Sequence, residues 1–445
     1  MINALIIIVV TGMLAAIVIR PKLGMVLLWP LLFMYPHYYM WQQLLPLNIG
    51  FDDLFICMMF LIVLIRRNMM TLGHFRFGYP FWSALVFIFV LLISNVNSYF
   101  MIKAGGEEIL KQTLKGFITL FLVYSYLNII DDFEDLKTLV FAFCFFSGIG
   151  AVLVILQNYF PGPMQIFVSE TEVRRAWELG EKARPSGAFL NANNAAVVLG
   201  VGGLMIASTM KLPALYFRKW VRILVLIPII LGVIVTRSRS GFLCLIIPLA
   251  VMAVFGKTKR YIWLIIIGGV IIVLLAPTLT SALFERFGQH SVGEGAGFWA
   301  PIKFRFDEVV RMWNSATLRR TIFGQNAIAD TALGELAPHN AYLGLPLVYG
   351  LLGTIWEIAF FVLLFVKSGQ MKRSSCTAIS VLGGAIRWSL LSIALYGIVG
   401  AFFESYYIRY VLFLLAVVAQ SGSKFASDYE FTETIDDNLL AECYT

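Results

Sequence analysis

The sequence predicts an all-α fold, a polytopic transmembrane helical bundle. Hydrophobic residues make up 60% of the 445-residue chain and charged residues only 13%, whereas a soluble globular chain carries about 25% charged residues. Apolar runs of near-span length recur along almost the whole sequence, and a helix needs about 20 residues to cross a bilayer. Basic clusters fall in alternate short loops, as in membrane proteins of fixed orientation. No room remains for a large soluble domain.

Thirteen apolar runs are candidate spans. The first two are separated only by Arg20-Pro21-Lys22, and several runs are short, so we expect about 12 spans, in the range 11–13. The first run has no basic region before it and no small-residue cleavage site after it, which indicates a retained helix rather than a signal peptide. The runs cover residues 2–19, 23–40, 51–65, 80–97, 109–129, 136–157, 190–210, 221–236, 241–256, 261–276, 342–366, 385–402 and 408–420.

The short basic loops predict the orientation, because lysine and arginine gather on the cytoplasmic side of membrane proteins. We therefore expect residues 1–420 to form a single membrane domain and residues 421–445 to form an acidic, disordered cytoplasmic tail. The basic clusters are Arg20 with Lys22, Arg66 with Arg67, Lys211 with Arg218, Lys219 and Arg222, Lys257 with Lys259 and Arg260, and Lys372 with Arg373.

Two longer loops, residues 158–189 and 277–341, fall on the opposite, periplasmic side. Long loops are translocated regardless of their charge, so their basic residues need a separate explanation. In the second loop, apolar side chains between Ile302 and Thr321, including Phe306 and Trp313, recur at helical spacings. This pattern predicts a short amphipathic helix near the outer membrane surface.

Several classes of function are disfavoured. The net charge of +8 would suggest nucleic acid as a partner of a soluble protein, but basic cytoplasmic loops account for it here. The five cysteines have no spacing typical of a metal site or a disulfide pair. The sequence also contains no Walker loop, no serine-hydrolase elbow and no metal-ligand cluster. We therefore expect neither a metal nor a cofactor.

Arginines from three distant segments are predicted to share one membrane face. They come from the two long loops and from Thr236-Arg237-Ser238-Arg239-Ser240-Gly241 at the outer end of a span. A guanidinium binds phosphate oxygens bidentately and never loses its charge, so this cluster suits a lipid diphosphate. Contact with ordinary lipid headgroups is the alternative. Arg239 favours the diphosphate, because it stands at a helix end where exposed N–H groups also attract anions.

His339 lies in Pro338-His339-Asn340, just before an apolar run. A histidine at a membrane boundary can serve in interfacial packing, and its functional use would be as a general base near neutral pH. The proximity of His339 to an arginine-rich face favours the general base.

Three asparagines, Asn191, Asn193 and Asn194, cluster at one helix start. Helix capping is the ordinary explanation, but it uses one such residue, so the others could face a polar cavity. Glu357 and Glu404 lie in or beside spans, where acidic side chains are costly and usually functional. Both glutamates could instead lie near an interface.

Five segments share an order and a predicted membrane face. They are Arg184-Pro185-Ser186-Gly187-Ala188-Phe189 with Asn191 to Asn194, Thr236-Arg237-Ser238-Arg239-Ser240-Gly241, Arg305 through Trp313, Phe323-Gly324-Gln325-Asn326, and Pro338-His339-Asn340-Ala341-Tyr342-Leu343 followed by Gly350 and Gly353. Together they resemble the O-antigen ligase and polymerase superfamily of bacterial envelope glycosyltransferases, which are GT-C-like membrane enzymes. The resemblance covers roughly residues 180–360 by motif, and the remaining spans are similar in hydropathy only.

The chain departs from the pattern of this superfamily at two places. Ser238-Arg239-Ser240-Gly241 stands where the superfamily usually has Ser-Arg-Gly, and Gly324-Gln325-Asn326 stands where it usually has Gly-x-Gly. The second departure concerns the loop conformation before His339, although asparagine also tolerates a left-handed backbone.

The resemblance implies a metal-independent, inverting glycosyltransferase of the bacterial inner membrane, with its active site facing the periplasm. The donor would be a glycan on undecaprenyl diphosphate, and the acceptor a sugar hydroxyl of a glycan or of lipid A–core. By the same resemblance His339 would position or deprotonate the acceptor hydroxyl. Membrane lipids and other proteins of polysaccharide assembly are the further expected partners. Arg184 and Arg239 would hold the diphosphate with help from Arg305 or Arg311, and Asn191, Asn194, Ser238 and Asn340 would support the site.

Two alternatives remain open at this point. Within the superfamily, nothing in the sequence separates a ligase from a polymerase of surface polysaccharide or exopolysaccharide. Outside it, a transporter or flippase for lipid-linked oligosaccharide has a similar hydropathy profile. Transporters place their binding groups near the bilayer midplane on broken helices, whereas the polar groups here are predicted to gather at one face.

Overall fold

The computed structural model shows an all-helical protein. In the part of the chain that the structure describes, every regular element is an α-helix or a short 3-10 helix, and no strand occurs. The predicted all-α fold class is therefore confirmed for these residues. The described residues are 2–34, 50–69, 76–102, 106–164, 167, 184–189, 191–212, 218–255, 263, 266, 269–270, 307, 310–314, 316–325, 341–398 and 405–433.

Each predicted apolar run except 261–276 coincides with a helix, and that run lies almost entirely outside the described residues. The elements are α1 (Ile2–Ile19), η1 (Pro21–Leu23), α2 (Gly24–Met34), α3 (Phe51–Met69), α4 (Tyr79–Ile102), α5 (Gly106–Ile129), α6 (Phe133–Tyr159), α8 (Ala192–Ser208), η4 (Thr209–Lys211), α9 (Lys219–Val235), α10 (Arg239–Phe255), α14 (Leu318–Phe323), α16 (Ala341–Arg373), α17 (Thr377–Gly397) and α18 (Tyr406–Glu433).

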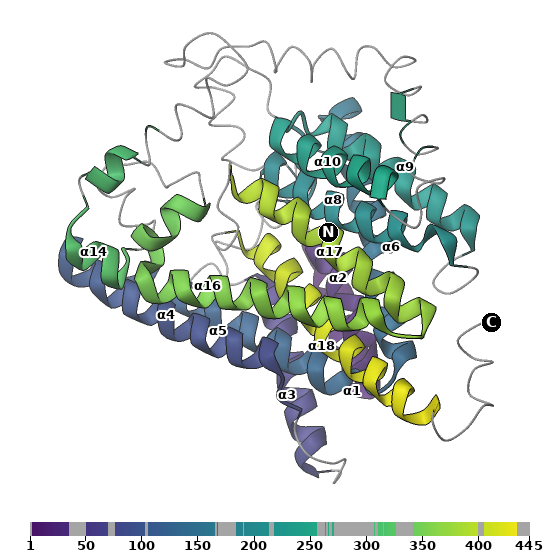
Figure 1. Cartoon of the computed structure of the whole chain (residues 1–445), viewed down its shortest axis with the longest axis horizontal. Helices are drawn as coiled ribbons and strands as arrows, with labels where there is room; N and C mark the ends of the chain where they lie inside the picture. Colours follow the sequence, from purple (N-terminus) through teal and green to yellow (C-terminus); the bar gives the residue numbers. More distant parts are fainter. Residues whose placement is uncertain are drawn as a thin grey trace.

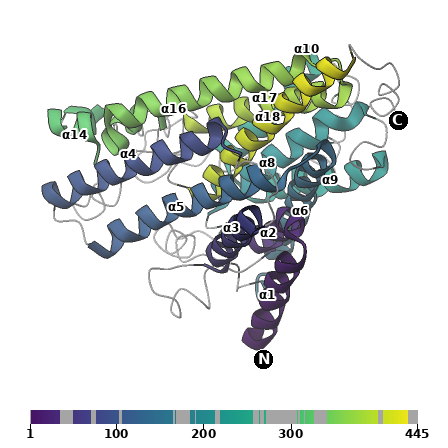
Figure 2. The same ribbon diagram turned by 90° about the horizontal axis from the view of Figure 1, so that it is seen from below.

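Two groups of helices pack around a common centre (Figure 1). In one group α4 lies against α5 and α16, and α3 lies against α5; in the other, α6, α8, α9 and α10 pack together. Both α17 and α18 contact members of the two groups and so join them. The view turned by 90° shows α4, α5, α16 and α18 running alongside one another, with α1, α2 and α3 below them (Figure 2).

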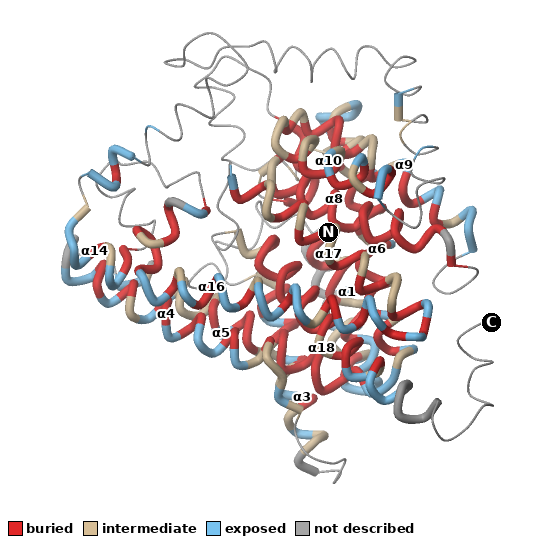
Figure 3. Tube along the Cα trace, viewed as in Figure 1, coloured by how far each residue is buried: buried red, intermediate tan, exposed pale blue. Residues whose placement is uncertain are grey.

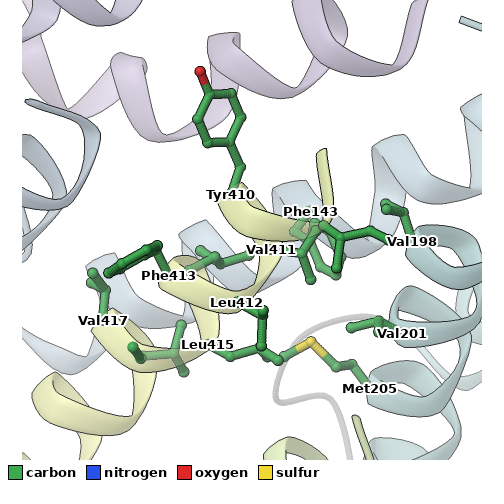
Figure 4. Close-up of a cluster of buried hydrophobic side chains, with 14 of the residues drawn as sticks. Phe143, Val198, Val201, Met205, Tyr410, Val411, Leu412, Phe413, Leu415 and Val417 are labelled. Atoms are coloured by element: carbon green, nitrogen blue, oxygen red, sulfur yellow. The ribbon is translucent and has the colours of Figure 1, made fainter. Parts of the chain in front are cut away.

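The helix α18 forms the centre of the core. Every residue from 407 to 419 is buried, as expected for a helix that is covered on all sides. Figure 4 shows the apolar cluster that its side chains form with Phe143 of α6 and with Val198, Val201 and Met205 of α8. The burial map shows the contrast with the outer helices, where buried and exposed positions alternate along each helix (Figure 3).

The exposed faces of the outer helices are apolar. On α16, Leu351, Ile355, Ile358 and Val362 recur at helical spacing and are all exposed, Ile358 by 60%. A helix facing water would carry polar residues there, whereas lipid tails accept an apolar face. Within the part of the chain that the structure describes, five helices are long and apolar enough to cross a membrane, which supports a membrane protein. They cover Tyr79–Phe100, Phe133–Tyr159, Gly344–Arg373, Thr377–Gly397 and Tyr406–Asp428.

The predicted acidic tail begins too early. The helix α18 continues to Glu433, so residues 421–433 are helical rather than disordered, and residues 434–445 lie outside the described residues. Packing explains the extension, because the Phe425 ring contacts Phe133 of α6 at 6.3 Å between centroids and Ala426 is buried. Such contacts extend a helix past the end of its apolar run.

The amphipathic helix predicted between Ile302 and Thr321 is not continuous. Residues 310–314 are helical, but α14 starts as a separate helix after Thr317. Thr317 has an extended backbone, and its hydroxyl accepts a hydrogen bond from the N–H of Arg320 at 3.2 Å. This is the geometry of an N-cap, and it ends one helix and starts the next.

Candidate functional site

The two ends of the bundle differ in how they hold charged side chains. At the start of α6, Lys22 pairs with Asp135 at 2.6 Å, and Arg67 and Arg76 both pair with Asp131, at 3.3 and 3.2 Å. We call this region, defined by these five residues, the ion-pair end. It contains two of the basic clusters from which the cytoplasmic side was predicted. The candidate site lies at the far end of α6, about 40 Å along a helix of this length.

The last turn of α6 fixes the segment that begins at Arg184. The side-chain oxygen Oε1 of Gln157 accepts hydrogen bonds from the backbone N–H groups of Ser186 and Gly187, both at 2.8 Å. Gly187 has φ +58°, a left-handed conformation that glycine adopts at little cost. The Arg184-Pro185-Ser186-Gly187 motif is therefore a buried turn whose shape depends on its glycine and on Gln157.

The asparagines at the start of α8 have two different roles, one in capping the helix and one in accepting hydrogen bonds from other segments. Asn191 is the N-cap residue, and its side chain accepts a hydrogen bond from the N–H of Asn194 at 2.8 Å. Asn193 has a different role, because its Oδ1 accepts from Arg184 Nη1 at 3.3 Å and from Ser238 Oγ at 2.8 Å. Asn193 thus joins the first arginine motif to the second.

The turn between α9 and α10 is built around an unusual backbone. Arg237 has φ +53°, the one positive φ of a non-glycine residue in the described part of the chain. Strain of this kind costs about 1–3 kcal/mol and concentrates at functional sites. The guanidinium of Arg237 donates to Asn158 Oδ1 at 3.2 Å, next to Gln157 in the sequence. Arg237 is among the arginines predicted to share this face, but Asn158 was not predicted, since only the fold brings the two together.

This turn also sets the start of α10. Ser238 Oγ accepts from the N–H of Gly241 at 3.1 Å, as an N-cap hydroxyl does, while it donates to Asn193. Arg239 is the first residue of α10 and is half-buried. The N-terminus of α10, where N–H groups favour anions, therefore lies close to Asn193 and to the Arg184 segment. Arg184, Arg237, Ser238, Asn158 and Asn193 define what we call the amide end.

Two glycines of the later motifs meet across α14 and α16. Gly324 has φ +76° and Gly350 has φ +72°, and a Cβ on Gly350 would lie 2.6 Å from Gly324 N. The N–H of Gln325 donates to Leu347 O at 2.8 Å, a contact that needs no particular side chain. Asn326, where the superfamily usually has its second glycine, lies outside the described residues.

A further arginine is held by an amide near this contact. Arg319 Nε donates to Asn97 Oδ1 at 2.8 Å, and Asn97 Nδ2 donates to Gly324 O at 2.6 Å. Asn97 lies at the end of α4 that is distant from Arg76, so this group is also remote from the ion-pair end. Arg319 is exposed.

The other predicted site residues have different outcomes. His339, Asn340 and Arg305 lie outside the described residues, as does Glu404. Arg311 lies on the helical residues 310–314 and is exposed, and no hydrogen bond joins it to the amide end within the described part of the chain. Glu357 is buried within α16. Asn194 is buried, and its N–H is capped by Asn191.

Comparison with known proteins does not assign the chain to a family. No protein-family model matches the chain, and no curated protein matches it. Among the described residues, no group of three or more histidine, cysteine, aspartate or glutamate side chains could hold a metal ion. The chemistry of the site therefore has to be inferred from its own residues.

Those residues suit an anion. Arg184 and Arg237 each donate to a side-chain amide oxygen, which orients a guanidinium without itself adding a negative charge. A fixed guanidinium in a site of low dielectric acts strongly on a developing negative charge. The amide end therefore provides oriented positive charge beside a helix N-terminus.

Proposed function

We propose that this protein is a metal-independent, inverting glycosyltransferase that transfers a glycan from undecaprenyl diphosphate to an acceptor sugar hydroxyl. It would act as an O-antigen ligase or as a polymerase of surface polysaccharide or exopolysaccharide. The resemblance of its motifs to the O-antigen ligase and polymerase superfamily gives the reaction, and the amide end gives the physical basis for binding the donor.

One observation carries this proposal. Asn193 Oδ1 accepts hydrogen bonds from both Arg184 and Ser238, and so joins two motifs that lie more than 50 residues apart in the sequence. An arrangement that only served lipid headgroups would not require these arginine segments to share one asparagine. A diphosphate leaving group does require fixed cationic groups, because charge develops on it as the glycosidic bond breaks.

The residues would divide the work as follows. Arg184 and Arg239 bind the diphosphate of the donor and stabilise it as it departs, with Arg305 or Arg311 assisting. His339 takes the proton from the acceptor hydroxyl, or orients that hydroxyl, as it attacks the sugar carbon. Asn191, Asn194, Ser238 and Asn340 support the site, and we include Asn193 with them because it accepts hydrogen bonds from Arg184 and Ser238. No step needs a metal, because guanidinium groups supply the charge.

The proposal also includes a membrane arrangement. About 12 helices would span the inner membrane of a bacterium, in the range 11–13 that the apolar runs allow. The ion-pair end faces the cytoplasm and the amide end faces the periplasm. Two exposed residues test this orientation, Thr317 before α14 and Ser427 near the end of α18. A membrane-impermeant thiol reagent added from the periplasm should label Thr317→Cys and not Ser427→Cys, and the reverse pattern would overturn the orientation.

The decisive experiment is transfer by the purified protein. The protein in detergent or nanodiscs receives a lipid-linked glycan donor and an acceptor, with and without EDTA. Transfer that survives EDTA supports the proposal. Loss of transfer that a divalent ion restores would contradict it. Ligase and polymerase are separated by the acceptor used, lipid A–core for a ligase and a second lipid-linked glycan for a polymerase.

A transporter or flippase is the second candidate, and one observation favours it. Lys115 of α5 and the buried Asp53 of α3 form an ion pair inside the bundle, and charges within membrane helices often mark transport pathways. The same assay decides between the two. Movement of a lipid-linked oligosaccharide across a vesicle membrane without any glycosidic transfer would support the transporter.

A further inference from the structure

The ion pair between Lys115 and the buried Asp53 is part of a larger polar group. Asp53 is fully buried. Its Oδ2 accepts from the N–H of Gly50 at 2.8 Å as well as from Lys115, and the hydroxyl of Tyr410 on α18 lies 3.4 Å from its Oδ1. Burying two charges costs free energy that a good geometry only partly returns. Such a pair is therefore expected to serve a purpose beyond stability.

Tyrosines in the first turn of α18 connect the ion pair to other parts of the bundle. Lys115 Nζ lies 5.1 Å from the centre of the Tyr406 ring, within the range of a cation–π contact. The rings of Tyr406 and Tyr407 stack at 4.2 Å. Tyr410 also contacts Tyr406, at 5.9 Å between ring centroids. The pair thus holds α18 through two tyrosines, and Tyr407 continues the chain of contacts.

Tyr407 reaches the segment that contains Arg184. Its hydroxyl donates to the backbone oxygen of Ala188 at 2.9 Å, and its ring packs on Phe189 edge-on at 5.2 Å. Both the donor and the acceptor side of this bond are buried, so water does not compete for it. Ala188 lies four residues after Arg184 and directly after Gly187.

Three separate helices therefore fix one short segment. Gln157 of α6 holds its backbone at Ser186 and Gly187, Asn193 of α8 holds the Arg184 guanidinium, and Tyr407 of α18 holds Ala188. Asn193 belongs to the amide end and Gln157 precedes Asn158 of that end in the sequence, whereas Tyr407 is joined to the ion pair. A displacement of a binding group by about 1 Å can cost a factor of about 100, so the third attachment matters for function.

We propose that Tyr407 is a positioning residue for Arg184, and that the ion pair between Lys115 and Asp53 holds Tyr407 in place. The ligand that benefits is a lipid-linked diphosphate, so this part of the inference rests on the proposed function. The positional part, that Tyr407 fixes the segment from Arg184 to Phe189, stands by itself. The buried charges then serve the donor site from a distance rather than conducting an ion.

The test compares two tyrosines that make the same kind of bond. Tyr407→Phe removes the bond to Ala188 O, and Tyr79→Phe removes a bond of 3.1 Å from Tyr79 to Ala416 O, which joins α4 to the other part of α18. Hydrogen exchange of the intact purified protein is measured at the amides of Ser186, Gly187 and Phe189. Binding of undecaprenyl diphosphate and the donor KM and kcat are measured on the same samples.

We expect exchange at these amides to be roughly 3- to 10-fold faster in Tyr407→Phe and unchanged in Tyr79→Phe, from the net strength of one buried hydrogen bond. The affinity for undecaprenyl diphosphate should fall and the donor KM should rise by a similar factor, with kcat changed less than about twofold. Unchanged exchange in Tyr407→Phe would overturn the inference. So would faster exchange with unchanged binding of undecaprenyl diphosphate, because the segment would then not need this attachment.

The ion pair is tested with a double substitution. Removing only Lys115 leaves a buried carboxylate and risks misfolding, so Lys115→Met is combined with Asp53→Asn. This double variant should show the same faster exchange at residues 186–189 as Tyr407→Phe. The single variant Lys115→Arg, which keeps the positive charge, should exchange as slowly as the wild type. If the wild-type protein binds no undecaprenyl diphosphate, the proposed function fails, while the exchange measurements still decide whether Tyr407 and the ion pair position the segment.

Discussion

At the ion-pair end Arg67 and Arg76 share the carboxylate of Asp131, whereas at the amide end Arg184 and Arg237 donate to the amide oxygens of Asn193 and Asn158. The nitrogen–oxygen distances of these four contacts are similar, between 3.2 and 3.3 Å. Among these four contacts the charge of the acceptor is what differs, and Arg67 and Arg76 also donate to the backbone oxygens of Asn128 and Ile130, at 2.7 and 2.6 Å. A carboxylate compensates the guanidinium that it holds, but a neutral amide only orients it.

This difference suggests two separate uses of arginine in one bundle. The side chain of Asp131 is 50% exposed, so its pairs lie where solvent weakens them and where they contribute little to stability. Arg184 is buried and its acceptor Asn193 is half-buried, so the charge of Arg184 is screened less and acts over a longer distance. The ion-pair end therefore suits the placement of loops at a membrane surface, and the amide end suits an anionic ligand.

The largest expected effect of any single change is that of His339→Ala. General-base assistance is worth about 10²–10⁴-fold, so transfer by the purified protein should fall by that factor while undecaprenyl diphosphate still binds. His74→Ala, in the chain between α3 and α4, is the matched control and should keep transfer within about twofold. Transfer at the wild-type rate by His339→Ala would show that the proposed active site is wrong.

The next effect concerns the arginines of the amide end. Arg184→Ala and Arg239→Ala should each weaken donor binding by about 1.5–3 kcal/mol, roughly 10- to 150-fold, because each loses charge-assisted phosphate contacts. Lysine should rescue only partly, since an ammonium lacks the planar fork. Arg76→Ala, at the ion-pair end, is the control and should leave the donor affinity unchanged. Arginine variants that bind donor normally and lose only turnover would exclude a ground-state diphosphate clamp.

A change in backbone rather than charge tests how the site is supported. Gly350→Ala should destabilise the protein by about 1–3 kcal/mol, because alanine adopts this backbone poorly and its Cβ would overlap Ile322 O and Gly324 N. Gly384→Ala in α17 meets no atom within 4 Å and should be neutral or stabilising by up to about 1 kcal/mol. Thermal unfolding in detergent compares the two variants. Equal melting temperatures would mean that the contact between α14 and α16 is not tight.

Exchanging the acceptor type tests the comparison of the two ends directly. Asn193→Asp keeps the shape of the side chain and both of its acceptor contacts, but places a negative charge beside Arg184. The donor diphosphate should then bind about 10-fold more weakly, from a repulsion of about 1–4 kcal/mol at short range, while the melting temperature is kept or raised. Isothermal titration or a filter assay with undecaprenyl diphosphate measures this. An unchanged affinity would show that the diphosphate does not lie near Asn193.

The sequence predicted the positions of the helices along the chain better than the contacts between them. Hydropathy alone located twelve of the helices, because span length and apolarity are local properties. It also placed the Arg184 and Arg239 motifs at one end, since alternation of the loops follows from the basic clusters. The end of α18 was missed, because its last turns are stabilised by Phe133, which lies almost 300 residues earlier.

The sequence also left open which residues join the arginine motifs, for a related reason. The cluster Asn191 to Asn194 indicated more than a cap, but only the fold shows that Asn193 rather than Asn194 joins the two arginine motifs. Arg237 and Asn158 could not be paired from the sequence, nor could Lys115 and Asp53. Each of these pairs depends on which helices are neighbours, and hydropathy contains no information on the order of helices in a bundle.

The smallest expected effect comes from the reciprocal exchange, Asp131→Asn. The substitution removes the negative partner of Arg67 and Arg76 but keeps an acceptor for both, so it imitates the amide end. Because Asp131 is 50% exposed, the loss of stability should stay below about 1 kcal/mol, and the donor affinity should not change, since α6 separates the two ends. Thermal unfolding and undecaprenyl diphosphate binding, measured beside Asn193→Asp, check both. A fall in donor affinity in Asp131→Asn as large as that in Asn193→Asp would mean that the two ends are coupled, and the separation of their roles would have to be abandoned.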